Sequence, residues 1–99
     1  MKNLIGGRLV DASDGKVIEV TNPATGELID TVPNATEQDV DMCVKEAVKA
    51  QKEWAKMPMH ERGDILYKFV DLVEAKKEEL AQLLSKETGK PIKEARDEI

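Results

Sequence analysis

The sequence is poor in the side chains that usually carry chemistry. Its 99 residues include three aromatics (Trp54, Tyr67 and Phe69), one cysteine and one histidine. Three aromatics are too few for a platform on which nucleic-acid bases stack. The single thiol, Cys43, excludes an internal disulfide and a cysteine-based zinc site, and the single His60 excludes a pair of histidine ligands. One unpaired cysteine fits a reducing compartment, so we expect a cytoplasmic location.

Positive charge is also scarce. Lys and Arg together number 15 against 20 for Asp and Glu, which gives a net charge of −5. The first 50 residues carry 5 basic and 9 acidic side chains, and no stretch is polybasic. Nucleic acids and anionic membrane surfaces both require clustered positive charge. No apolar run approaches the ~20 residues of a membrane span. We therefore expect neither nucleic acid nor a membrane as a partner.

A glycine-rich phosphate loop is missing as well. The loops that hold dinucleotides or nucleoside triphosphates place glycines between a strand and a helix. The Gly6-Gly7 pair lies inside a strand-like run with no helix after it. We interpret the pair as a bulge or a close backbone approach. No nucleotide cofactor is expected to bind this chain tightly.

The first third of the sequence predicts three β-strands, within residues 4–32. An apolar run over 4–10 and a β-branched run over 16–21 flank an Asp-Gly turn, which is typical of a hairpin. The Asn-Pro-Ala-Thr-Gly-Glu segment 22–27 has the composition of a second turn. A third strand is expected over 28–32, ending at Pro33.

The rest of the sequence has helical periodicity. Apolar residues recur every three or four positions over 37–55 and over 60–87, which predicts two long amphipathic helices. Thr36 is a suitable N-cap for the first helix, and Gly89 is placed to end the second. A third helical pattern begins over 91–99 and has no stop signal. We therefore expect an α+β fragment of a longer protein, the alternative being a terminal helix that ends at Ile99.

No residue stands out as catalytic. Cys43 lies on the apolar stripe of the first helix, so we interpret it as a small core residue rather than a nucleophile. His60 has no identifiable nucleophile nearby and fits a surface or capping role. The carboxylates have the spacing of solvated helix faces, and Trp54 and Tyr67 fit packing roles. On these grounds the chain is either a binding module or one part of a larger protein.

Several short motifs occur in an order that resembles the NAD(P)-dependent aldehyde dehydrogenase superfamily. The two clearest are Asn22-Pro23-Ala24-Thr25-Gly26-Glu27 and Glu87-Thr88-Gly89-Lys90-Pro91. The run Leu4–Val10, the helix segment Ala47–Trp54 and the turn Met57–Arg62 also match in order. The resemblance covers nearly the whole chain and is nearest to the succinate-semialdehyde and lactaldehyde dehydrogenase branches.

The resemblance implies that residues 1–99 are the N-terminal part of the cofactor-binding domain, within the α/β aldehyde dehydrogenase fold. The parent enzyme would oxidise an aldehyde to a carboxylic acid with NAD or NADP, through a cysteine nucleophile and a glutamate base. Both of those residues, and the nucleotide-binding loop, belong to segments beyond residue 99. Cys43 does not match the catalytic position. The isolated chain is expected to be inactive, with the remainder of the enzyme as its partner.

The resemblance also implies one site within the chain. Some family members bind a monovalent cation at the positions of Val20, Thr21 and Glu87, through two backbone carbonyls and a carboxylate, which are suitable oxygen ligands. The alternative for Glu87 is a solvated carboxylate at a helix end. A second hypothesis for the whole chain is a stand-alone interaction module derived from the same fold. Because two long apolar stripes have few strands to cover them, we expect the isolated chain to self-associate.

Overall fold

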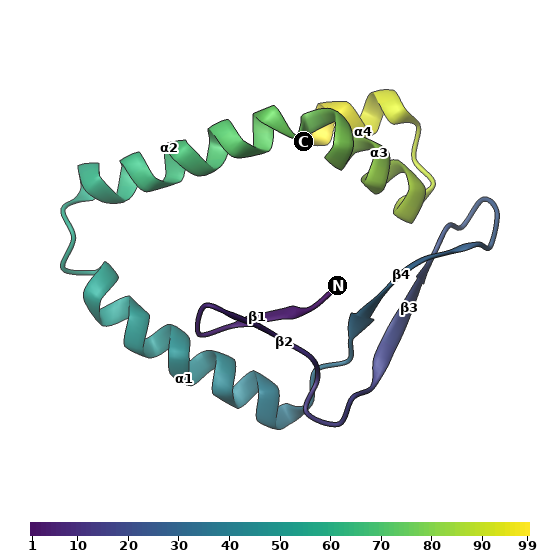
Figure 1. Cartoon of the computed structure of the whole chain (residues 1–99). Helices are drawn as coiled ribbons and strands as arrows, with labels where there is room; N and C mark the ends of the chain where they lie inside the picture. Colours follow the sequence, from purple (N-terminus) through teal and green to yellow (C-terminus); the bar gives the residue numbers. More distant parts are fainter. The chain divides into compact units, whose positions relative to one another are not determined.

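The computed structural model describes all 99 residues and confirms the α+β class, with four strands and four helices (Figure 1). In chain order the elements are β1 (Asn3–Ile5), β2 (Arg8–Val10), β3 (Val17–Thr21), β4 (Leu28–Pro33), α1 (Glu37–Trp54), α2 (Met59–Ala75), α3 (Lys77–Thr88) and α4 (Ile92–Glu98). Residues 1–20 and 30–57 form one compact unit, and residues 21–29 and 58–99 form a second. None of the four helices is both long enough and apolar enough to span a membrane.

The strand pairing differs from the prediction. Residues 4–10 do not pair with 16–21, because they already fold back on themselves as the β1–β2 hairpin, with Ile5 opposite Arg8. Gly6 and Gly7 form its two-residue turn with φ values of 56° and 76°. Positive φ at both positions defines a type I′ turn, whose twist suits a hairpin. The glycine pair is therefore a turn, and the interpretation as a bulge was wrong.

The strands β3 and β4 form a separate two-stranded sheet, joined by the predicted turn over 22–27. The Asn22 side chain accepts a hydrogen bond from the Ala24 N–H at 2.9 Å, as expected of an Asx-turn. The Asn22 N–H donates to the Glu27 carbonyl at 2.9 Å, and the Gly26 N–H donates to the Asn22 carbonyl at 2.7 Å. Local side-chain chemistry therefore fixes this turn, as the sequence indicated.

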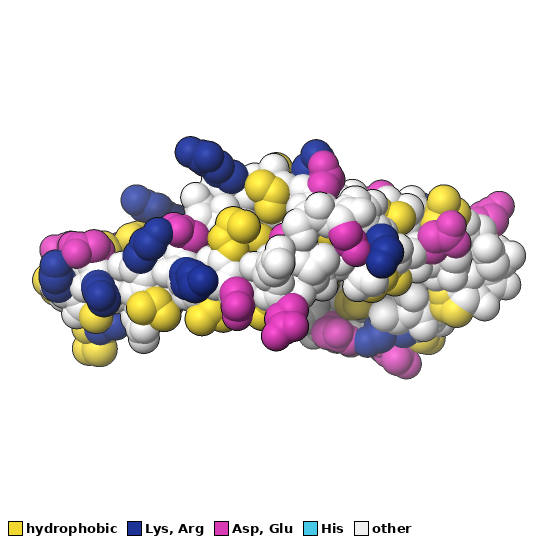
Figure 2. All heavy atoms as spheres, turned by 90° about the horizontal axis from the view of Figure 1, so that it is seen from below, with side chains coloured by type: hydrophobic (Ala, Val, Ile, Leu, Met, Phe, Trp, Pro, Cys, Tyr) yellow, Lys and Arg dark blue, Asp and Glu magenta, His cyan; other side chains and the backbone are white.

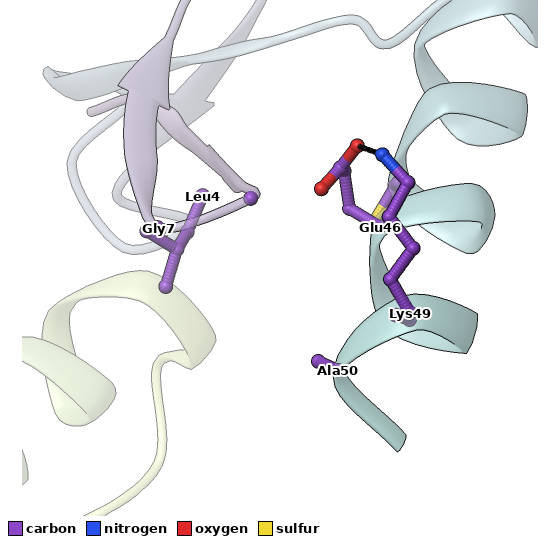
Figure 3. Close-up of a pocket in the computed structure, with 8 residues that line it drawn as sticks. Leu4, Gly7, Glu46, Lys49 and Ala50 are labelled. Carbon is purple, nitrogen blue, oxygen red and sulfur yellow. Dashed lines mark hydrogen bonds and ion pairs between the residues drawn. The ribbon is translucent and has the colours of Figure 1, made fainter. Parts of the chain in front are cut away.

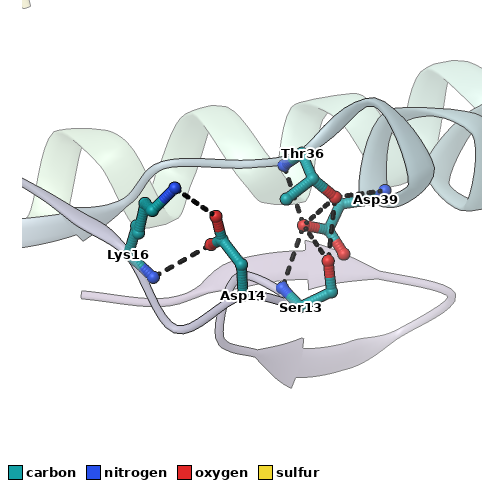
Figure 4. Close-up of polar contacts among 5 residues, drawn as sticks. All are labelled: Ser13, Asp14, Lys16, Thr36 and Asp39. Atoms are coloured by element: carbon teal, nitrogen blue, oxygen red, sulfur yellow. Dashed lines mark hydrogen bonds and ion pairs between the residues drawn. The ribbon is translucent and has the colours of Figure 1, made fainter.

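A polar cluster ties the start of α1 to the loop before β3 (Figure 4). Thr36 caps the helix: its hydroxyl accepts from the Asp39 N–H at 3.2 Å, while an Asp39 carboxylate oxygen accepts from the Thr36 N–H at 2.9 Å. That same oxygen accepts from the Ser13 N–H at 3.0 Å. The hydrogen bonds from the Ser13 and Thr36 backbones lower the pKa of Asp39, which is only 4% exposed. Asp14 pairs nearby with Lys16.

The second predicted helix, over 60–87, is two helices in the structure. Lys76 separates α2 from α3 with φ −108° and ψ 9°, outside the helical region. Lys76 and Lys77 interrupt the apolar stripe at this point, so the two halves need not bury a single continuous face. The predicted end at Gly89 is confirmed: its φ is 74°, and its N–H donates to the Ser85 carbonyl at 2.9 Å.

The best-packed part of the second unit is the pair of helices α3 and α4. Ala81 and Ala95 are both 0% exposed, because small side chains let the two helices approach closely. Arg96 binds Glu78 with two hydrogen bonds, Nε at 2.8 Å and Nη2 at 2.9 Å. These bonds, with a further one from Gln82, lower the pKa of Glu78 to about 2. The Ser85 hydroxyl closes the connection by donating to the Lys90 carbonyl at 2.7 Å.

Candidate functional site

The three residues predicted to bind a cation lie at the ends of two elements. Val20 is half-buried in β3, Thr21 is the exposed last residue of that strand, and Glu87 is half-buried in the last turn of α3. Within the second unit, a Cβ atom placed on Gly89 would lie 3.1 Å from Cγ of Pro23. The segment that follows Thr21 therefore contacts the end of α3. This contact brings together two segments whose ends carry Thr21 and Glu87.

Neither the single cysteine nor the single histidine lies in a catalytic arrangement. Cys43 is exposed, so its assignment to the core was wrong. The stripe around it is uncovered: Val40, Val44 and Val48 are 53%, 54% and 48% exposed. His60 is exposed at the start of α2, in agreement with a surface role. No three His, Cys, Asp or Glu side chains gather where they could hold a metal ion.

The two aromatic residues expected to pack behave differently. Trp54 is half-buried at the end of α1, whereas Tyr67 is 73% exposed on α2. The packing role is therefore wrong for Tyr67. The periodicity of an apolar stripe shows which face of a helix would be buried, but not whether a partner surface is present.

An open groove of about 580 Å³ runs between α1 and the β1–β2 hairpin (Figure 3). Its lining combines small or apolar side chains with one ion pair: Leu4, Gly6, Gly7, Cys43, Glu46, Ala47, Lys49 and Ala50. Glu46 and Lys49 pair with each other on α1. A Cβ on Gly6 would lie 3.2 Å from Cγ of Glu46, so glycine allows the hairpin turn to approach the helix. Such a lining suits apolar contact, and its one carboxylate is held in the ion pair with Lys49.

Large apolar side chains are unusually exposed in this chain. The helix α2 contains no buried residue at all, and hydrophobic side chains lie among the charged ones on the face drawn in Figure 2. The chain thus presents surfaces suited to burial against other polypeptide.

Comparison with known proteins agrees with the sequence motifs. The model of the aldehyde dehydrogenase family matches residues 9–99. The chain is 46% identical over 98 residues to the D-glyceraldehyde dehydrogenase (NADP(+)) of Picrophilus torridus, which covers 99% of this chain and 20% of that protein. It is 44% identical over all 99 residues, again 20% of the relative, to malonate-semialdehyde dehydrogenase 1 of Geobacillus kaustophilus.

Solved structures give the same result. The structure of succinate-semialdehyde dehydrogenase from Burkholderia pseudomallei matches with a TM-score of 0.94 and 36% identity, over 98% of this chain and 20% of that one. The chain therefore spans about a fifth of the length of the relatives it matches. Its fold agrees with that of the solved structure over 98% of this chain. This chain belongs to the aldehyde dehydrogenase family.

Proposed function

We propose that this chain is the N-terminal scaffold segment of a cytoplasmic NAD(P)-dependent aldehyde dehydrogenase, which oxidises an aldehyde to a carboxylic acid. The main support is the uncovered apolar surface of α1 and α2, in a chain that matches a fifth of each relative. The remaining four fifths would supply the nucleophile, the base and the nucleotide-binding loop. The chain itself helps to shape the cofactor-binding domain, and we expect no activity and no tight NAD(P) binding from it alone.

A full-length chimera tests this function. Residues 1–99 would replace the matching fifth of the Geobacillus malonate-semialdehyde dehydrogenase 1. We expect the chimera to reduce NAD(P) with malonate semialdehyde, and the isolated chain not to do so. The control is the Geobacillus enzyme lacking the segment, which should be inactive. A chimera that folds but gives no product, beside an active parent, would contradict the proposal.

The second candidate is a stand-alone interaction module, which would have to cover the same surfaces by itself. Exposed side chains such as Phe69 at 63% and Leu72 at 66% favour association with other polypeptide, whether the chain is an enzyme segment or a stand-alone module. We propose that the isolated chain self-associates. Multi-angle light scattering should show dimers or larger species, and a clean monomer at high concentration would refute self-association.

We also propose that Val20, Thr21 and Glu87 bind a monovalent cation in the full-length enzyme. The contact between Gly89 and Pro23, close to two of these residues, supports the proposal. Carbonyl and carboxylate oxygens suit a hard cation. In the chimera, Glu87→Gln should weaken the dependence of stability on K⁺ or Na⁺, with Glu94→Gln, an exposed carboxylate on α4, as the control. Equal salt dependence in both variants would contradict the site.

A further inference from the structure

Arg62, in the first turn of α2, has a buried donor without an acceptor. Its backbone N–H donates to the Pro58 carbonyl at 3.2 Å, but its side-chain Nε is inaccessible to solvent and makes no hydrogen bond. A guanidinium is always protonated, so Nε always carries a hydrogen to donate. A buried donor of this kind is costly when unpaired, and more costly when it is charged. The Arg62 guanidinium therefore lacks a hydrogen-bond acceptor that would offset this cost.

The same residue lies on the apolar face of α2. Ile65, Leu66 and Phe69 follow Arg62 at three, four and seven positions, so all four share one side of the helix. These three apolar side chains are 45%, 57% and 63% exposed. The α2 face, as we call these four residues, is thus a broad apolar surface with one unpaired positive charge within it. Its complement is an apolar surface that carries one anionic acceptor.

The α2 face does not complement itself. Three of the four α2 carboxylates, Asp64, Asp71 and Glu74, lie on the other side of the helix by the same helical spacing, and Glu61 lies only at the edge of the face. In a symmetric dimer the same patch meets itself, so two copies joined through this face would place two guanidinium groups in one apolar contact, with carboxylates only at its edge. A second copy is therefore a poor occupant of this face, even where other faces drive self-association.

We propose that the α2 face docks onto a segment of the remaining four fifths of the parent polypeptide, and that this segment places a carboxylate on the Arg62 guanidinium within an apolar contact. This inference rests on the proposed function. It is supported by charge complementarity and by the relatives, in which the same fold is a fifth of a longer chain. Arg62 is then a positioning residue that fixes how α2 sits on that segment, because an arginine–carboxylate bond is directional.

The test compares Arg62→Met with Lys68→Met, in the active chimera and in the isolated chain. Methionine keeps the length and apolar stem of each side chain, and Lys68 is exposed and lies off the α2 face. In the chimera we expect Arg62→Met to raise the unfolding equilibrium constant about ten- to a hundredfold, and Lys68→Met to change it less than about twofold. Arg62→Lys should lie between, because an ammonium lacks the planar fork.

The stability of Arg62→Met in the isolated chain separates the docking role of Arg62 from a local structural role, which would destabilise both proteins alike. There, Arg62→Met should be neutral or stabilising, because it removes an unpaired buried donor. In the chimera, the cost of Arg62→Met should shrink as the pH falls below about 4, where a carboxylate acceptor is protonated.

Three results would overturn the inference. The first is an active chimera in which the two methionine variants are equally stable. The second is an Arg62→Met variant that loses as much stability in the isolated chain as in the chimera. The third is a cost of Arg62→Met that does not depend on pH. An inactive chimera counts against the proposed function instead, and the isolated-chain comparison then still decides whether Arg62 has a local structural role.

Discussion

Replacing Gly89 with alanine should destabilise the second unit in two separable ways. Its φ of 74° is left-handed, and an L-residue there costs about 1–2 kcal/mol. The new Cβ would also lie 3.1 Å from Cγ of Pro23, so the turn or the helix end must shift. Overpacking of this kind adds about 1 kcal/mol, at the low end for one methyl group. We therefore expect Gly89→Ala to cost about 2–3 kcal/mol in total.

Two other glycines provide matched controls for the same substitution. Gly15 has a φ of 71° but nothing within 4 Å of its Cβ position, so Gly15→Ala should show the backbone strain alone. Gly63 lies within α2 and also has open space at Cβ. Because alanine is the better helix former, Gly63→Ala should stabilise the helix by about 0.8–1 kcal/mol. Alanine is thus expected to destabilise the chain at Gly89 and Gly15, where φ is positive, and to stabilise it at Gly63, which is helical.

The assay is urea and thermal unfolding of the isolated chain, followed by far-ultraviolet circular dichroism. For a domain of this size, 1 kcal/mol shifts the Tm by about 4–8 °C. A double-mutant cycle with Pro23→Ala isolates the contact, because the steric part of the cost of Gly89→Ala should disappear once the proline ring is gone, which gives a non-zero coupling energy. Equal costs for Gly89→Ala and Gly15→Ala, with no coupling to Pro23, would refute the contact. A destabilising Gly63→Ala would refute the helical argument.

Two further predictions concern carboxylates whose pKa values are lowered. Because folding depresses the pKa of Asp39, the ionised form stabilises the folded chain above the unfolded value near 4, and this contribution is lost as the pH falls through the folded value. Asp39→Asn should remove that part of the acid transition, and an unchanged circular-dichroism titration would contradict the role of the cap. Arg96→Gln should return the pKa of Glu78 from about 2 toward its ordinary 4.5. Carbon-detected NMR titration measures this directly, and a midpoint that stays near 2 would show that Arg96 is not the cause.

Local signals in the sequence predicted local structure well. The Thr36 cap, the Asn22 turn and the Gly89 helix end were all confirmed, because each depends on hydrogen bonds or φ values within a few residues. The predicted pairing of residues 4–10 with residues 16–21 was wrong, because the sequence contains two local turn signals that compete. Gly6-Gly7 and the Asp-Gly turn at Gly15 are both turn signals, and strand alternation does not choose between two hairpins.

Burial was harder to predict than secondary structure. The pattern around Cys43 and Tyr67 correctly marks faces that are apolar, yet both side chains are exposed. Whether such a face is covered depends on polypeptide outside the pattern. The unpaired Nε of Arg62 had no sequence signal, because the sequence does not show which single side-chain atom will be shielded from solvent. The shortage of strands to cover two long apolar stripes was the sequence feature that anticipated these uncovered surfaces.

The close pairing of α3 and α4 has a consequence for the order of folding. Ala81 and Ala95 are the buried residues of the two helices, and the Glu78–Arg96 pair joins residues only 18 positions apart. Contacts over such short distances close loops quickly, and proteins rich in them fold fastest. The α3–α4 pair can therefore close without contacts from distant parts of the chain. It would then be a preformed nucleus on which α2 and the rest of the second unit assemble.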